Sequence, residues 1–172
     1  KHWRWEHSVH HATAGDLDRR GVGDVWTLTV KEYIAMSRWD RIVYRMVRNP
    51  IILFGIAPSY VFLMRERWTS PRASQKTRRT VKFTNRALLV MFLIGGLIFG
   101  FGPYILIQVG IMAVAASAGV WLFYIQHQFE GVYWERHEHW EYTSAALEGS
   151  SFYRLPRIFQ WFTGNIGFHH VH

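Results

Sequence analysis

One long uncharged stretch constrains the fold of this chain more than any other feature of its sequence. Residues 87–126 contain no Asp, Glu, Lys or Arg. A helix needs only about 20 apolar residues to cross the hydrocarbon core of a bilayer. The sequence therefore predicts an all-α, integral membrane helical protein.

The uncharged stretch is long enough for two membrane spans. Glycine and proline in Gly100-Phe101-Gly102-Pro103 are expected to break the helix near its middle. We therefore predict one transmembrane hairpin over about residues 84–126, with its second span running from about Tyr104 to Ile125. Both ends of such a hairpin return to the same side of the membrane.

A basic segment precedes the hairpin. Between residues 65 and 86 the single acid is Glu66. Basic residues beside a membrane span mark the cytoplasmic side. Nucleic acid is not expected as a partner, because the segment adjoins the apolar spans. The basic residues are Arg65, Arg67, Arg72, Lys76, Arg78, Arg79, Lys82 and Arg86.

An amphipathic helix is predicted earlier in the chain. A capping box at residues 29–32 starts it, and Pro50 stops it near Asn49. Trp39 and Met46 share an apolar face, while arginines lie mostly elsewhere on the surface. Such a helix suits the headgroup layer of a membrane, although a surface helix packed on protein would show the same pattern.

Three further elements complete the expected fold. The apolar segment Ile51–Met64 would span only about 21 Å as a helix, which is too short for a bilayer, and is expected to be re-entrant, interfacial or buried against protein. Gly149 is expected to end a helix in the polar region that follows the hairpin. Pro156 is expected to begin another short helix.

The distribution of histidines is the most informative functional feature. Four of the ten lie between residues 2 and 11 and six between residues 127 and 172, with none in between. Because the predicted hairpin returns to the side it left, the two clusters should face the same aqueous side and could meet. A third crossing at Ile51–Met64 would place them on opposite faces.

The amino-terminal cluster contains His7, His10 and His11 in an HxxHH pattern. Residues three and four apart lie on one face of a helix. The triplet could therefore offer imidazole nitrogens to one metal ion or to two neighbouring ones. Imidazole suits Fe, Zn, Cu and Ni, whereas a single buried histidine is more often a packed core residue.

The carboxy-terminal histidines differ in their expected roles. His169 and His172 are three residues apart, as ligands on one helical turn would be. His127 follows the uncharged stretch, where it could bind metal or cap helix carbonyls. His137 and His139 are two residues apart in a charged segment, so we expect them to be solvated.

Other metal chemistries are excluded by composition. The chain has no cysteine, so iron–sulfur clusters and thiolate zinc sites are excluded. No glutamate is followed by a histidine three residues later, as soluble ferritin-like di-iron sites require. A metal site in this chain would therefore be rich in imidazole and not in carboxylate.

The chain resembles the membrane fatty acid desaturase family, especially acyl-lipid desaturases of the omega-6 (delta-12) type. The resemblance extends over essentially the whole chain and is carried by three long segments. They are WEHSVHHATAGDLDRRGVGDVWTLTVKEY at residues 5–33, WLFYIQHQFEGVYWE at 121–135 and GSSFYRLPRIFQWFTGNIGFHHVH at 149–172.

The resemblance implies a ligand set, because the family holds two iron ions in three histidine boxes. Asn165 would hold a metal-bound water. The first box would lie upstream, so residues 1–172 are expected to be an internal piece of a single desaturase domain that lacks some ligands. By this resemblance the metal ligands are His7, His10 and His11 of the second box, His169 and His172 of the third, and His127.

The resemblance also implies an activity and partners. The expected reaction is O₂-dependent insertion of a cis double bond into an acyl-lipid or fatty acyl thioester, with ferredoxin or cytochrome b5 as electron donor and the histidine clusters on the cytoplasmic side. A hydroxylase or ketolase on the same scaffold is the nearest alternative. A membrane haem- or zinc-binding protein and a purely structural membrane protein are the non-enzyme alternatives.

Overall fold

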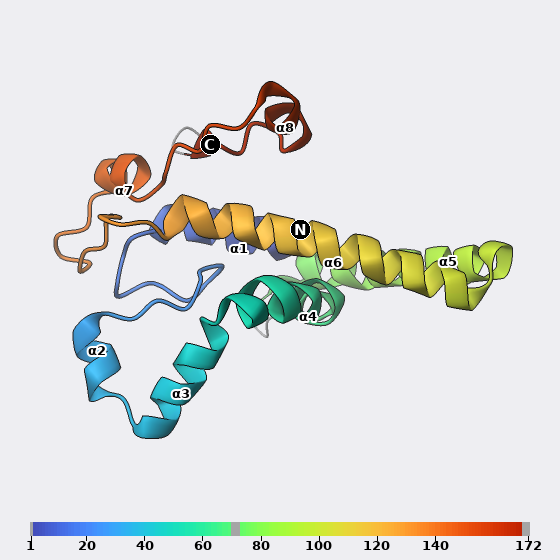
Figure 1. The fold of residues 1–172 in the computed structure, drawn as a ribbon, viewed down its shortest axis with the longest axis horizontal. Helices are drawn as coiled ribbons and strands as arrows, with labels where there is room; N and C mark the ends of the chain where they lie inside the picture. The colour runs from blue at the N-terminus through green and yellow to red at the C-terminus, as the bar shows by residue number, and fades with distance from the viewer. Residues whose placement is uncertain (1, 70–72, 170–172) are drawn as a thin grey trace. The chain divides into compact units, whose positions relative to one another are not determined.

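A computed structural model describes residues 2–69 and 73–169, and within these ranges every regular element is helical (Figure 1). This confirms the predicted all-α class. Extended pairing in these ranges consists of isolated bridges, such as that between Asp16 and Glu135. The helices are α1 (His2–Thr13), α2 (Val30–Ala35), α3 (Arg38–Val47), π-helix η1 (Ile52–Ile56), α4 (Ala57–Leu63), 3₁₀ helix η2 (Arg65–Arg67), α5 (Gln75–Phe99), α6 (Phe101–His127), α7 (Tyr142–Glu148) and α8 (Arg157–Phe162).

The chain forms two compact units. Lys1–Trp5 and Ser37–Val120 make up the first, which contains α3 to α5 and most of α6. Glu6–Met36 and Trp121–His172 make up the second, which contains most of α1, the end of α6, and α2, α7 and α8. The predicted ligands that the structure describes all belong to the second unit.

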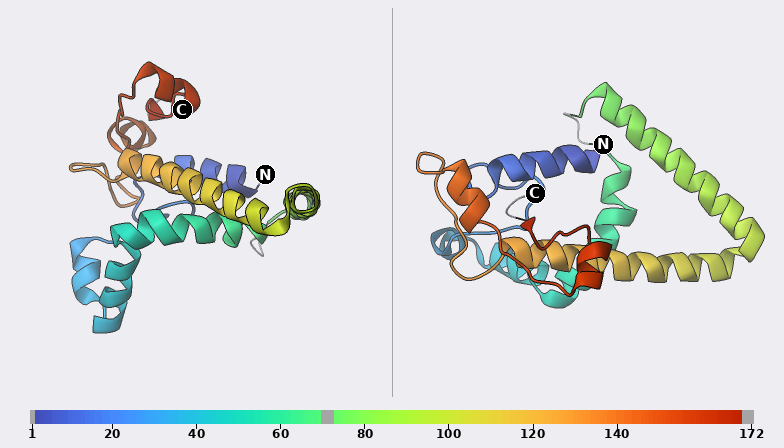
Figure 2. Two further views of the ribbon diagram at one scale, coloured as in Figure 1. Left: turned by 45° about the vertical axis from the view of Figure 1, so that its right-hand side comes forward. Right: turned by 90° about the horizontal axis from the view of Figure 1, so that it is seen from above.

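The uncharged stretch forms the second half of α5 and nearly all of α6, which are joined by a tight turn. Gly100 ends α5 with φ 80°, a left-handed conformation that glycine adopts without strain. Pro103 lies in the first turn of α6, where its missing N–H costs nothing. A Cβ on Gly95 would lie 2.4 Å from the ring of Tyr104, so glycine permits this close approach. Beyond the turn the two helices diverge (Figure 2).

Both helices expose apolar side chains along their length. Leu97 and Leu106, for example, are 77% and 75% exposed. In the described part of the chain, α5 and α6 are each long and apolar enough to cross a membrane. One further pair of segments, Arg38–Val47 and Ile52–Arg67, passes the same test only when the two are taken together, and because they are bent by 56° they would form a broken span or a re-entrant loop.

The capping box is confirmed, but the single helix predicted beyond it is wrong. Thr29 accepts a hydrogen bond from the Glu32 backbone, and the Glu32 carboxylate accepts one from the Thr29 backbone. The helix then ends at Ala35 and Met36 is extended. Ser37 starts α3 by accepting a hydrogen bond from the Asp40 backbone. The prediction joined the capping box to the apolar face that ends at Met46 and overlooked Ser37, a residue type favoured at N-caps.

The two predictions for the carboxy-terminal region are confirmed. Gly149 follows the last residue of α7, and Pro156 immediately precedes α8. Within the second unit, the loop after α1 pairs with the segment before α7. Leu17 donates its backbone N–H to Glu135, and the Trp140 indole donates to the Ala14 carbonyl at 2.9 Å. These contacts tie the end of α1 to the chain that follows α6.

Candidate metal centre

The carboxy-terminal end of α6 is held by side chains and backbone that follow α7. A helix leaves its last carbonyls without partners inside the helix. The Ser151 hydroxyl donates to the Ile125 carbonyl at 2.8 Å, and the Ser151 backbone donates to the Gln126 carbonyl at 2.9 Å. Gln126, fully buried, donates its amide to Ile166. These bonds fix the position of His127, the last residue of α6.

The His127 ring is oriented by a backbone carbonyl. Its Nδ1 lies 3.3 Å from the Gly149 carbonyl oxygen, which can only accept a hydrogen bond. In the neutral ring Nδ1 therefore carries the proton, and Nε2 keeps its lone pair. Gly149 packs tightly here, since a Cβ would lie 2.3 Å from the Ala145 carbonyl. The tight helix end after α7 thus sets the direction of the His127 lone pair.

His10 is oriented in the same way by a carboxylate. Its Nδ1 contacts the Asp24 carboxylate, whose second oxygen accepts the Gly21 backbone N–H at 2.9 Å. His10 is only 3% exposed. The sequence analysis missed Asp24, which lies fourteen residues from His10 in a glycine-containing loop. The signal that could have found it is an aspartate that follows Gly21 and Gly23 in the loop after the HxxHH pattern.

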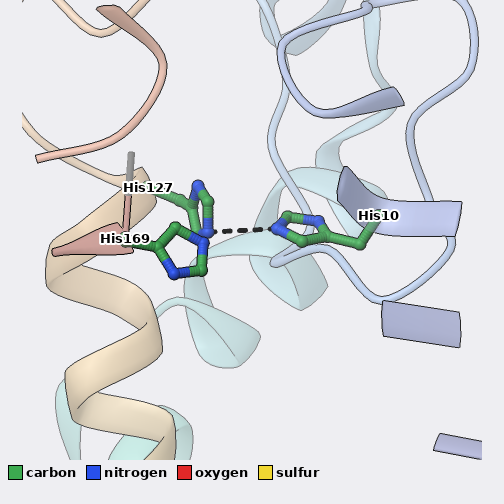
Figure 3. A group of neighbouring side chains, drawn as sticks. All are labelled: His10, His127 and His169. Carbon is green, nitrogen blue, oxygen red and sulfur yellow. Dashed lines mark hydrogen bonds between the residues drawn. The ribbon is translucent and has the colours of Figure 1, made fainter. Parts of the chain in front are cut away.

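The two oriented rings point their remaining nitrogens at each other. His10 Nε2 and His127 Nε2 lie 3.0 Å apart (Figure 3). Two neutral rings with protonated Nδ1 atoms would repel at this distance, so the pair needs a shared proton or a metal ion. His169 offers a third nitrogen, and ligand atoms of all three rings lie within 4.8 Å of one another. A proton would link two of these nitrogens, whereas a metal ion can bind all three.

A second pair of imidazoles lies beside the first. His7 Nε2 and His11 Nε2 are 3.1 Å apart on successive turns of α1. The His169 ring lies 4.9 Å from that of His11 and 4.6 Å from that of His127, between centroids. The structure therefore brings five of the predicted ligands together as two close pairs with His169 near both.

The donor set fits a borderline metal such as iron or zinc. Imidazole nitrogens are ligands for both, and two nitrogens on one zinc ion at about 2.0–2.1 Å would be roughly 3.0–3.4 Å apart. The separations of 3.0 Å and 3.1 Å agree with this. Phe123 covers one side, with its ring centroid 5.1 Å from that of His10 and 4.9 Å from that of His127. Such apolar cover limits the access of water to the site.

Two predicted site residues remain to be placed. His172 lies outside the described residues. Asn165 is exposed, and its backbone adopts φ 60° in a turn where it donates to the Gln160 carbonyl. This turn precedes His169, so Asn165 shapes the chain that delivers His169 to the cluster.

His137 and His139 belong to a different surface. His137 Nδ1 lies 2.8 Å from the fully buried Asp16 carboxylate, and its Nε2 lies 2.7 Å from the Arg19 guanidinium. The His139 side chain is 73% exposed. The His137 side chain is half exposed and is held by two charged side chains of the loop after α1.

Charged pairs reinforce the same loop. The His137 backbone N–H and the Arg136 guanidinium both donate to Asp18 and lower the pKa of its carboxyl group. Arg20, together with the Thr29 backbone, lowers the pKa of Glu32 from 4.5 to about 2. Both neighbourhoods thus favour the charged form of the carboxylate.

Comparisons with known proteins identify the family of this chain. A family model described as "Fatty acid desaturase" matches residues 1–172. A "Fatty acid desaturase" of Bacillus subtilis (strain 168) is 50% identical over 170 residues, which cover 99% of this chain and 48% of that protein. The chain therefore spans about half the length of this curated relative. No solved structure matches it.

Proposed function

Because the chain belongs to the fatty acid desaturase family, we propose that it is part of a membrane-bound, non-haem di-iron fatty acid desaturase. Residues 1–172 would form one portion of a single desaturase domain. The observation that carries this proposal is the convergence of the His10 and His127 lone pairs at 3.0 Å, beside the His7–His11 pair. Two close pairs of imidazoles suit two metal ions better than one.

The geometry suggests how this chain's residues divide between the irons. His10 and His127 would hold one iron, and His7 and His11 the other. His169 lies near both pairs and would complete one of them. His172 and residues upstream of this chain would supply further ligands. The water-mediated role of Asn165 stays a prediction, since its side chain is exposed.

Bound iron would activate O₂, so that an acyl chain loses two hydrogens while O₂, two electrons and two protons form two water molecules. The chain's own residues prepare the site for this reaction. Asp24 and Gly149 fix the directions of the His10 and His127 rings. Phe123 packs against both rings and limits the access of water.

The setting in the membrane follows from α5 and α6. We propose that they form the transmembrane hairpin, with the basic segment at residues 65–86, which includes the first turns of α5, on the cytoplasmic side. The histidine clusters would face that side too. An acidic electron donor, ferredoxin or cytochrome b5, would suit the basic surface. The substrate would be an acyl-lipid or fatty acyl thioester, with delta-12 (omega-6) selectivity by the sequence resemblance.

The decisive test is to express the full-length protein in a host that lacks polyunsaturated lipids and to analyse its fatty acids by mass spectrometry. A new product lighter by two hydrogens, absent with His127→Ala, is expected. A product that has gained oxygen would instead indicate a hydroxylase or ketolase. A Soret band in the purified protein would indicate haem and contradict the proposal.

A further inference from the structure

We propose that Asp24 is a positioning residue for iron binding, which holds His10 in the tautomer and orientation that present Nε2 to the metal. This inference rests on the proposed function. Asp24 acts on the imidazole cluster through His10. It contacts His10 on Nδ1, the nitrogen opposite the one that lies 3.0 Å from His127.

The Asp24 carboxylate uses both oxygens. One contacts His10 Nδ1 and the other accepts the Gly21 backbone N–H at 2.9 Å. The second bond holds the carboxylate in place across its own turn. Both partners of the His10 contact are shielded from solvent, with His10 4% and Asp24 7% exposed at their side chains. A buried, anchored acceptor can therefore fix the His10 ring.

Gly23 brings this loop onto α1. It has φ 75°, and a Cβ at this position would lie 3.2 Å from the His10 Cβ and 3.3 Å from the Glu6 carbonyl oxygen. The loop backbone thus packs directly against the helix turn that bears His10. Glycine allows both the conformation and the close approach. Asp24, the next residue, is placed beside the His10 ring as a result.

The tautomer argument predicts what an amide would do at this position. A carboxylate only accepts, so it keeps the proton on His10 Nδ1. An asparagine has one oxygen and one NH₂ group. If its oxygen serves Gly21, its NH₂ faces His10 Nδ1, and the imidazole proton moves to Nε2, where it blocks metal binding. If Asp24 served only to accept the Gly21 backbone N–H, an asparagine oxygen would do this equally well.

The experiment compares Asp24→Asn with Asp16→Asn in the purified full-length protein. Asp16 is a matched control, because its buried carboxylate contacts Nδ1 of His137, which lies outside the cluster. Iron affinity is measured by competition with a chelator, and the iron environment by Mössbauer spectroscopy. Loss of a partner of this kind typically costs 10–100-fold in metal affinity. We expect a loss in that range and an altered spectrum for Asp24→Asn, and neither change for Asp16→Asn.

Wild-type iron affinity and spectrum in Asp24→Asn would overturn the inference. If His10→Ala loses iron while Asp24→Asn does not, only the role of Asp24 fails. If His10→Ala also retains iron, the proposed metal site fails. Should the asparagine variant not fold, Asp24→Glu is compared with Asp16→Glu. Asp24→Glu is then expected to retain iron more weakly than Asp16→Glu, and equal retention in the two variants would count against the proposal.

Discussion

Two aspartate–histidine pairs in the second unit have the same carboxylate contact, but the second ring nitrogen of the histidine has a different neighbour in each. In each, a shielded carboxylate contacts Nδ1 of a histidine, Asp24 with His10 and Asp16 with His137. The difference lies at the opposite nitrogen. His10 Nε2 faces the His127 imidazole, whereas His137 Nε2 faces the guanidinium of Arg19.

The comparison shows that a carboxylate orients a histidine without deciding its function. Arginine is always a hydrogen-bond donor and never an acceptor. The Arg19 guanidinium, at 2.7 Å, therefore occupies the lone pair of His137 Nε2 and repels a metal cation. The Nε2 lone pair of His10 instead faces that of His127. The neighbour of Nε2 therefore distinguishes a histidine with a structural role from a candidate metal ligand.

The largest expected effect comes from removing the histidine of one aspartate–histidine pair, His10, and the matched control removes the histidine of the other, His137. His10→Ala should reduce bound iron and desaturation by more than the 10–100-fold typical of losing an indirect partner, because it deletes a ligand. His137→Ala should leave both within a few-fold of wild type. Iron analysis and fatty acid profiling of the two full-length variants measure this. Equal losses in both variants would erase the distinction between the pairs.

The next effect concerns the loop that carries Asp24. Gly23→Ala and Gly131→Ala both place alanine at positive φ, which costs about 1–2 kcal/mol in the left-handed region. Only at Gly23 does the new Cβ also press on α1, at 3.2 Å from the His10 Cβ, while at Gly131 nothing lies within 4 Å. We expect both variants to lose thermal stability but only Gly23→Ala to lose iron affinity. Unchanged iron affinity in Gly23→Ala would show that the loop does not control the His10 ring.

A smaller effect is expected at the end of α6. Ser151→Ala removes the hydroxyl that bonds the Ile125 carbonyl, and should cost about 1 kcal/mol of stability. Ser150→Ala is the matched control, since its hydroxyl bonds the Ala146 carbonyl in the last turn of α7. Chelator competition should show weakened iron binding in Ser151→Ala and wild-type binding in Ser150→Ala. The reverse order would contradict the idea that Ser151 supports His127.

The smallest effect is a dependence of stability on pH at Glu32. Its folded-state pKa is lowered from 4.5 to about 2, chiefly by Arg20. The stabilisation is therefore complete above about pH 4.5 and is lost as pH falls toward 2. Because the side chain is 30% exposed, we expect about 1 kcal/mol or less.

Thermal unfolding of wild type and Glu32→Gln at pH 6 and pH 3 tests this expectation. The stability difference between them should narrow at the lower pH. Glu138→Gln serves as the control, because the Glu138 side chain is 77% exposed. A difference that widens toward pH 3 would refute the sign of the effect.

The sequence predicted the helix pair and much of the cluster for physical reasons that are local. An uncharged stretch can only be buried or lie in lipid, and Gly100 supplies the conformation that ends α5. Histidines three and four residues apart share a helix face whatever surrounds them. The resemblance to desaturases then linked His127 and His169 to that face.

The features that escaped prediction depend on contacts between distant segments. Asp24 lies fourteen residues from His10 in sequence, and only the packing of Gly23 on α1 brings it to the ring. Ser151 caps α6 from beyond α7. The break at Ser37 had a local signal, because serine is favoured at N-caps, and this signal was overlooked. Local patterns cannot show which loop will reach which helix end.

The central claim is that the histidines of α1, the end of α6 and the chain near His169 bind a pair of irons. Mössbauer spectroscopy on iron-57-enriched, purified full-length protein tests it most directly. The account predicts signals of non-haem iron equivalent to two ions per chain, with at least one of the two lost when His10 and His127 are replaced by alanine. Two irons that persist unchanged in that double variant would contradict it.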